Sequence, residues 1–215
     1  MENINKSLNN ILDNDTESDQ KLNKNNHKSI IKILEPIYEN LGQTFGNGVK
    51  NLTYGEIEFS TLELITTYFP KLKDGYFYDL GCGRSKAVLY MSLTNFFTKC
   101  IGIDIVTERI NLSKDALKQL KKIKDIDNIK FYEKSFLDDK FNYNNASLIF
   151  INNLCFEDDL NENLFNKIKN ESKNGTYLFL TKLPENLDGF KEVKIETVIM
   201  SWSNESSLYI IKVKK

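Results

Sequence analysis

The sequence predicts a single α/β domain: a seven-stranded, mostly parallel sheet with helices on both faces and an antiparallel hairpin at its C-terminal edge. Strand-like and helix-like runs alternate from about residue 76 onward, and parallel strands need such helical crossovers. The last two strand-like runs have no helix between them, so we expect them to pair as a hairpin. A length of 215 residues, 40% of them hydrophobic, supports one substantial core rather than two.

The N-terminal region divides into a polar tail and the start of the domain. Residues 1–27 are rich in Asn, Asp, Ser and Lys, which predicts a disordered tail. The spacing of their apolar residues also fits a short amphipathic helix, which is the alternative. The folded domain is expected to span residues 28–215.

Two helices are predicted before the first strand, in a helical segment over residues 28–70. The first runs over 28–41 with its apolar residues on one stripe and Pro36 as an imperfection. The second opens at the capping-box pattern Ser60–Glu63 and ends before Pro70. Glycines between the two helices mark a loop.

The rest of the chain alternates between short apolar runs and longer amphipathic ones. Short apolar runs between turn residues predict strands, and apolar residues three and four apart predict helices. The predicted strands cover residues 76–80, 100–104, 129–133, 146–151, 176–181, 191–199 and 207–213, and the predicted helices cover 85–96, 107–123 and 159–171.

Composition excludes several classes of function. The only histidine, His27, lies in the polar tail, which leaves little for a Ser-His couple or a histidine-bound metal, and no metal site is predicted. The three cysteines form no C-x-x-C pair, which is typical of reduced thiols. The sequence has no membrane-spanning run and no signal-peptide pattern, so we expect an intracellular protein, cytoplasmic or nuclear.

A glycine-rich turn follows the first predicted strand. Gly81 and Gly83 let the backbone pass close to a ligand, and the next helix, with Lys86 in its first turn, offers unpaired amides. The run Asp-Leu-Gly-Cys-Gly, with Asp79 two residues before the first glycine, is typical of enzymes that bind S-adenosyl-L-methionine. In those enzymes the acid faces the positively charged methionine end, and many have a third glycine where this chain has Ser85. The sequence therefore predicts a Rossmann-like cofactor site, with a tight turn that binds nothing as the alternative.

Two later strand ends supply further expected cofactor contacts. Asp104 ends the second strand about twenty residues after the glycines, the spacing at which an acid accepts hydrogen bonds from ribose hydroxyls. After the third strand, Phe136 is expected to cover the adenine, and Ser135 stands where an acid usually contacts the adenine amino group. Plain core packing is the alternative for Phe136.

Three separated motifs resemble those of one family, the disruptor-of-telomeric-silencing type of histone lysine methyltransferase. That family lacks a SET domain and has the seven-strand class I methyltransferase fold. Residues 54–56, Tyr-Gly-Glu, are similar to its Y-G-E loop, which closes over the cofactor. Residues 151–156 are similar to its V-N-N-F-x-F, with Leu154 in place of the first Phe. Residues 200–202, Met-Ser-Trp, and the downstream Tyr209 resemble its V-S-W and the tyrosine of the last strand.

The resemblance covers roughly residues 30–215 and implies a protein-lysine N-methyltransferase. It places Tyr54 and Glu56 at the cofactor, and Asn152 beside the cofactor near the reacting centre. A lysine amine attacks only when neutral, and its ordinary pKa is about 10.4, so an apolar channel that disfavours the ammonium has a chemical purpose. The residues that the resemblance places along such a channel are Phe156, Trp202 and Tyr209.

Other functions stay open. Enzymes of this fold that methylate nucleobases or glutamine commonly have prolines after the fourth strand, where this chain reads Asn-Asn-Leu-Cys. A small-molecule methyltransferase and a degenerate binding module are further alternatives, and Ser85 and Ser135 favour the latter. As a partner we expect a protein with an accessible lysine and no membrane. Because the formal net charge is -1, we expect no strong nucleic-acid binding unless lysines cluster locally.

Overall fold

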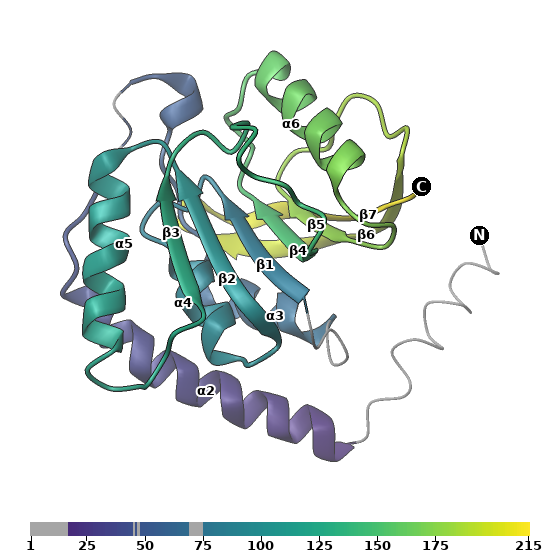
Figure 1. The fold of residues 1–215 in the computed structure, drawn as a ribbon. Coiled ribbons are helices and arrows are strands. Elements are labelled where there is room, and N and C mark those ends of the chain that lie inside the picture. The colour runs from purple at the N-terminus through teal and green to yellow at the C-terminus, as the bar shows by residue number, and fades with distance from the viewer. Residues whose placement is uncertain (1–16, 45, 47, 69–74) are drawn as a thin grey trace.

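The structure, a computed structural model, describes residues 17–44, 46, 48–68 and 75–215. Seven strands form its single sheet: β1 (Gly75–Leu80), β2 (Phe97–Asp104), β3 (Ile129–Glu133), β4 (Ala146–Ile151), β5 (Tyr177–Leu180), β6 (Phe190–Met200) and β7 (Ser203–Val213). Their order is β3-β2-β1-β4-β5-β7-β6. Strands β1 to β5 run parallel, and β7 lies antiparallel between β5 and β6. The predicted fold class is therefore confirmed (Figure 1).

Helices cover both faces of the sheet (Figure 1). One face packs against α2 (Glu17–Glu39), α3 (Phe59–Thr67), α4 (Lys86–Leu93) and α5 (Thr107–Leu120), and the other packs against α6 (Asp158–Glu171). Because the central strands are buried on both faces, they are nearly continuous apolar runs rather than alternating ones. Within the described residues, no helix is long and apolar enough to cross a membrane.

The N-terminal helix is longer than the sequence suggested. α2 begins at Glu17, inside the predicted tail, rather than at Lys28, and it continues through Pro36 to Glu39. The rest of the predicted tail, residues 1–16, lies outside the described residues.

Buried polar contacts anchor His27, the last residue of the predicted tail, within α2. His27 on α2 is only 7% exposed. Its Nδ1 lies 2.6 Å from the hydroxyl of Tyr90 on α4, and its Nε2 lies 3.0 Å from the carboxylate of Glu63 on α3. His27 therefore lies in a polar stretch of sequence but links α2, α3 and α4 through buried contacts.

We expect acidification to weaken the fold through His27. Burial lowers the pKa of His27 from its ordinary value of 6.5, although the charge of Glu63 acts in the opposite direction. The unfolded chain then binds a proton more readily than the folded chain, so stability that is present above about pH 6.5 is lost as the pH falls below it. Urea titrations between about pH 5 and pH 7 should show a smaller pH slope in His27→Gln than in the wild type. Equal slopes would contradict this role for His27.

The predicted capping box at Ser60–Glu63 is wrong. Helix α3 begins at Phe59, and its N-cap, Glu58, makes no side-chain capping bond. The Thr61 hydroxyl instead donates to the carbonyl of Ile199 on β6, at 2.7 Å. The carboxylate of Glu63, which the pattern assigned to the helix start, pairs instead with His27 on α2.

The C-terminal hairpin extends further than predicted. β6 and β7 continue until Ser201 and Trp202 alone separate them. The first residues of β7, Ser203–Ser207, are polar and give no strand signal, but they pair with β6. Trp202 therefore lies at the tip of a tight turn.

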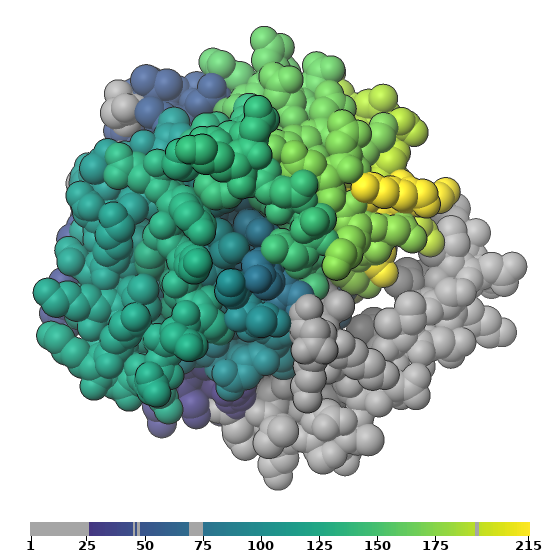
Figure 2. Space-filling model, viewed as in Figure 1, coloured from purple at the N-terminus to yellow at the C-terminus, as the bar shows by residue number. Residues whose placement is uncertain are grey.

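A short 3-10 helix, η1 (Lys50–Leu52), lies above the carboxyl ends of the strands, between α5 and α6 (Figure 1). In the space-filling view its blue surface adjoins the green surface of the α6 region (Figure 2). The Asn51 side chain donates to the Glu157 carboxylate at 3.0 Å, and the Leu52 carbonyl accepts from Arg109 at 2.6 Å. These bonds tie η1 to the starts of both α6 and α5.

Candidate active site

A cavity opens at the carboxyl ends of β1, β2 and β4, beneath η1 and the loop that follows it. The strand order reverses between β1 and β4, and ligands of open α/β sheets bind at such a point. Its wall contains every residue expected to bind the cofactor: Tyr54, Glu56, Asp79, Gly81, Gly83, Lys86, Asp104, Ser135, Phe136 and Asn152.

The glycine turn after β1 needs its glycines for conformation and for space. Gly81 and Gly83 have φ values of 83° and 54°, in the left-handed region that glycine enters without strain. A Cβ atom at Gly83 would also approach Cε2 of Tyr54 to 2.6 Å. The turn therefore lets the loop containing Tyr54 close directly onto the backbone.

Ser85, at the position where a third glycine was expected, adopts the left-handed conformation with a φ of 61°. Its hydroxyl is fully buried and lies 2.7 Å from the hydroxyl of Ser113 on α5. Ser113 in turn donates to the carbonyl of Gly83 at 2.9 Å. The departure from glycine thus keeps the turn geometry and adds a buried hydrogen-bonded link to α5.

Asp79 presents a buried and unpartnered carboxylate. The residue is 4% exposed, and among the described residues no group donates a hydrogen bond to its carboxylate or forms an ion pair with it. Burial, and then the negative charge of Asp104, raise the pKa of Asp79 well above its usual range. A carboxyl group in this state gains most from a cationic ligand group, so the end of β1 is a site for positive charge.

Asp104 is oriented by the backbone around it. Its Oδ2 accepts from the amide of Gly83 and its Oδ1 from the amide of Val106, both at 2.9 Å. The guanidinium of Arg109 lies 3.9 Å from Oδ2. The carboxylate is therefore fixed in the cavity wall while part of its accepting capacity stays free.

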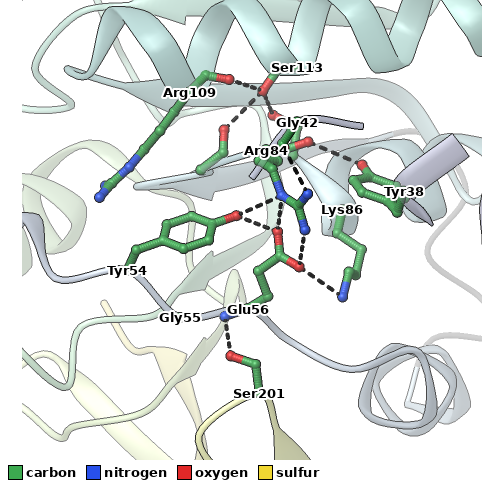
Figure 3. A network of polar contacts seen from close by, with 12 residues as sticks. Tyr38, Gly42, Tyr54, Gly55, Glu56, Arg84, Lys86, Arg109, Ser113 and Ser201 are labelled. Atoms are coloured by element: carbon green, nitrogen blue, oxygen red, sulfur yellow. Dashed lines mark hydrogen bonds and ion pairs between the residues drawn. The ribbon is translucent and has the colours of Figure 1, made fainter. Parts of the chain in front are cut away.

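Glu56 is held by cations from the start of α4 (Figure 3). Arg84 donates to it through Nε at 2.7 Å and Nη2 at 2.9 Å, and Nζ of Lys86 lies 3.1 Å away. The Tyr54 hydroxyl also donates to this carboxylate. Burial raises the pKa of Glu56, but the hydrogen bond from Arg84 and the charge of Lys86 outweigh burial and lower this pKa to about 2. Lys86 thus lines the cavity as the ion-pair partner of Glu56.

The Tyr54–Glu56 loop is also bonded to two distant segments. The amide of Glu56 donates to the Ser201 hydroxyl, and the amide of Ser201 donates to the Glu56 carbonyl, both at 2.8 Å. The side chain of Asn152, after β4, donates to the Gly55 carbonyl at 3.1 Å. The motifs at residues 54–56, 151–156 and 200–202 therefore meet at one place.

The two asparagines after β4 have different surroundings. Asn152 faces the cavity, and its amide oxygen accepts from the Thr181 hydroxyl at 3.1 Å. Asn153 is fully buried, accepts from the amides of Thr181 and Lys182, and donates to Asn161. Asn153 therefore fixes the ends of β4 and β5, and Asn152 is left for the site.

The aromatic wall of the cavity is a stacked pair. Phe136 and Phe156 lie with ring centroids 5.6 Å apart, and both rings are mostly buried. Phe156 also lies against Gly81, where a Cβ atom would come within 3.5 Å of its ring. Ser135 is exposed, and its hydroxyl accepts from the amide of Leu137 at 3.1 Å.

The residues expected along a lysine channel are only partly brought together. Phe156 lines the cavity, but neither Trp202 nor Tyr209 is among the described residues in its wall. The Trp202 ring packs directly on Gly55, where any Cβ atom would collide with it, and the residue is 40% exposed. Tyr209 is half-buried on β7 and packs with the cluster beneath α6.

Two functional candidates were missed by sequence reasoning, Arg84 and Arg109. Arg84 directly follows Gly83, and a cation next to the glycine turn could have been predicted to lie at the site from the sequence alone. Arg109 lies in the first turn of α5 and reaches Asp104 only because α5 packs beside β2. No local pattern identifies that contact.

Comparison with known families supports the resemblance. A family model described as "Histone methylation protein DOT1" matches residues 39–209. The matched range contains all three motifs, which meet at the Tyr54–Glu56 loop. No curated protein sequence matches the chain.

Solved methyltransferase structures share the fold. An RNA methyltransferase from Salinibacter ruber, crystallised with S-adenosyl-L-homocysteine, has a TM-score of 0.56 at 14% identity and covers 73% of this chain and 92% of that one. A Streptococcus mutans protein assigned as a methyltransferase, also bound to S-adenosyl-L-homocysteine, has a TM-score of 0.54 at 12% identity, covering 71% and 97%. An rRNA methylase from Streptococcus thermophilus has a TM-score of 0.50 at 13% identity, covering 66% and 89%. Identities this low establish the class I methyltransferase fold alone.

Proposed function

Because the chain belongs to the DOT1 family of histone methylation proteins, we propose that it methylates the amine of a lysine side chain on a protein. Family and fold together make it a methyltransferase that uses S-adenosyl-L-methionine. The observation that carries the finer proposal is the meeting of three distant motifs: Gly55 is bonded to Asn152 and Glu56 to Ser201.

The residues around the cavity fit S-adenosyl-L-methionine. The unpartnered carboxylate of Asp79 suits the ammonium of its methionine end, and the free accepting capacity of Asp104 suits ribose hydroxyls. Phe136 offers an aromatic face for adenine. When bound, this cofactor supplies a methyl group on a positively charged sulfur.

In our proposal the protein's residues deliver a neutral amine to that methyl group. A lysine with its ordinary pKa of about 10.4 is almost entirely protonated at pH 7. The apolar rings of Phe156 and Trp202 would disfavour the ammonium and enclose the aliphatic stem. Asn152, fixed between Gly55 and Thr181, would hold the loop over the site. A dedicated base is not required, because water can accept the proton.

The proposed channel lies near the Tyr54–Glu56 loop. Phe156 lies in the cavity wall and Trp202 packs on Gly55, so these two aromatic residues are the strongest candidates to line it. Tyr209 lies outside the cavity wall, so a role for it would require a substrate that extends beyond the cavity toward β7.

A transfer assay tests the proposal. The protein is incubated with methyl-labelled S-adenosyl-L-methionine and cell lysate, and the product is digested separately with protease and nuclease. We expect label on lysine side chains, identified by mass spectrometry, that is lost to protease and survives nuclease. Label on RNA or on a small molecule would overturn the lysine proposal in favour of those substrates. Cofactor binding without any transfer would support a degenerate module instead.

We expect the activity not to require nucleosomes. Enzymes that act on nucleosomes commonly use a lysine-rich segment that neutralises DNA phosphates, which makes binding strongly salt-dependent. In this chain the acids at 13, 15, 17 and 19 balance the lysines at 6, 21, 24 and 28, and Lys212, Lys214 and Lys215 stand at the end of the last strand. Transfer to nucleosomes, free histones and a non-chromatin lysate should be compared at low and high salt. Salt-sensitive activity on nucleosomes alone would contradict this expectation.

A further inference from the structure

Arg109 is a buried cation in the cofactor cavity whose bonding is incomplete. It lines the cavity and is 6% exposed. Its Nη2 donates to the Leu52 carbonyl at 2.6 Å, and its Nη1 lies 3.9 Å from Oδ2 of Asp104, a distance beyond a hydrogen bond. Its Nε is buried without any hydrogen-bond partner among the described residues.

A buried N–H group without an acceptor is costly. The desolvation penalty is roughly 1–3 kcal/mol, and it is larger when the group carries charge. Native structures satisfy nearly all such groups, and at a binding site an acceptor supplied by the ligand would remove this penalty. The nearby Asp104 does not serve as that acceptor in this arrangement, because Nε makes no hydrogen bond to it and the contact between the two side chains is that of Nη1 with Oδ2, at 3.9 Å.

Arg109 also holds the loop that covers the cavity. Its guanidinium carbon lies 4.9 Å from the centroid of the Tyr54 ring, and its bond to Leu52 fixes η1 against α5. Figure 3 shows its side chain extending from α5 toward Tyr54. One side chain thus contacts both the covering loop and the acid expected to bind ribose.

We infer that Arg109 binds the nucleoside half of S-adenosyl-L-methionine directly and also positions the loop over it. Its Nε–H would donate to an oxygen or nitrogen of the ribose or adenine, while Nη2 keeps the η1 loop closed over the same half. Asp79, at the end of β1, and Glu56, paired with Arg84 and Lys86, would act on the amino-acid half. The inference concerns cofactor binding, and it holds or fails independently of the lysine proposal.

Fragment binding separates the two halves. Calorimetry measures the affinities of wild type, Arg109→Met and Asp79→Asn for S-adenosyl-L-methionine and for 5′-methylthioadenosine, which lacks the amino-acid group. In Arg109→Met we expect both ligands to bind about 10- to 100-fold more weakly, by a similar factor. In Asp79→Asn we expect only S-adenosyl-L-methionine to bind more weakly. A loss in Arg109→Met confined to S-adenosyl-L-methionine, or no loss for either ligand, would overturn the inference.

Two further measurements keep the test decisive if Arg109→Met is poorly folded. Arg109→Lys retains the positive charge near Asp104 but lacks the Nε–H donor, so it should also bind 5′-methylthioadenosine more weakly; wild-type affinity in this variant would contradict the inference. Hydrogen exchange of the ligand-free proteins should be faster over residues 50–56 in both Arg109 variants than in the wild type. Unchanged exchange there would show that Arg109 does not hold the loop.

Discussion

Asp79→Asn should lower the affinity for S-adenosyl-L-methionine by about 10- to 100-fold, because a charge-assisted hydrogen bond contributes roughly 1.5–3 kcal/mol. The same change should leave the ligand-free protein as stable as the wild type or more stable. Burial raises the pKa of Asp79 well above its ordinary value of 3.8, so folding disfavours the ionised form, and at neutral pH this carboxyl lowers the stability of the ligand-free protein. Calorimetry gives the affinity and thermal unfolding without ligand gives the stability.

Opposite changes in affinity and stability separate a binding residue from a structural one. A structural carboxylate would lose stability on substitution, and the affinity would fall as a consequence. Asp188→Asn is a matched control, because Asp188 is an exposed acid outside the cavity wall and should change neither quantity appreciably. A fall in stability with unchanged affinity in Asp79→Asn would contradict the proposed placement of the cofactor.

Acidification should weaken cofactor binding in the wild type more than in Asp79→Asn. Below its raised pKa, Asp79 is protonated and no longer attracts the ammonium of the ligand. Asn cannot titrate, so the variant lacks this contribution. Equal pH dependence of the affinity in both proteins would show that Asp79 does not face the ammonium.

The residues expected to bind the cofactor line one cavity, and the sequence could predict this grouping because its signals are local. Gly81 and Gly83 are needed for a left-handed backbone conformation. Asp104 ends the next strand, at a distance from the glycines that is set by the crossover between neighbouring strands. Periodicity likewise predicted each strand of the sheet, because buried parallel strands are continuous apolar runs. The last strand was predicted too short. The polar residues at the start of β7 pair with β6 through backbone hydrogen bonds, which their side chains do not reveal.

The contacts that close the site could not be predicted, because each joins segments far apart in the chain. Arg84 to Glu56, Arg109 to Leu52 and Ser201 to Glu56 all depend on how helices pack on the sheet. The same limit applies to His27. The polar composition around it predicted exposure to solvent, but its partners, Tyr90 and Glu63, lie on other helices. Composition reports the average surroundings of a segment and misses a single buried residue within it.

Trp202→Ala should reduce methyl transfer by about 100-fold while changing the affinity for S-adenosyl-L-methionine much less. We expect this because Trp202 lies beside the loop that covers the cavity and outside the cavity wall itself, so its loss would affect alignment of the incoming amine. Because Trp202 is 40% exposed and packs on Gly55, its truncation also removes buried apolar surface, and the unfolding free energy should fall by roughly 1–3 kcal/mol. Turnover is measured by label transfer and affinity by calorimetry.

Two companion variants interpret the result for Trp202. Trp202→Phe keeps an apolar ring on Gly55 and should recover most of the turnover. Phe156→Ala should lower turnover and cofactor affinity together, because Phe156 stacks on Phe136 and lies against Gly81, so its removal opens a hole in the cavity wall itself. If Trp202→Ala lowered both quantities equally, as Phe156→Ala is expected to do, Trp202 would be a support for the loop at Gly55, and the proposed lysine channel would have to lie elsewhere.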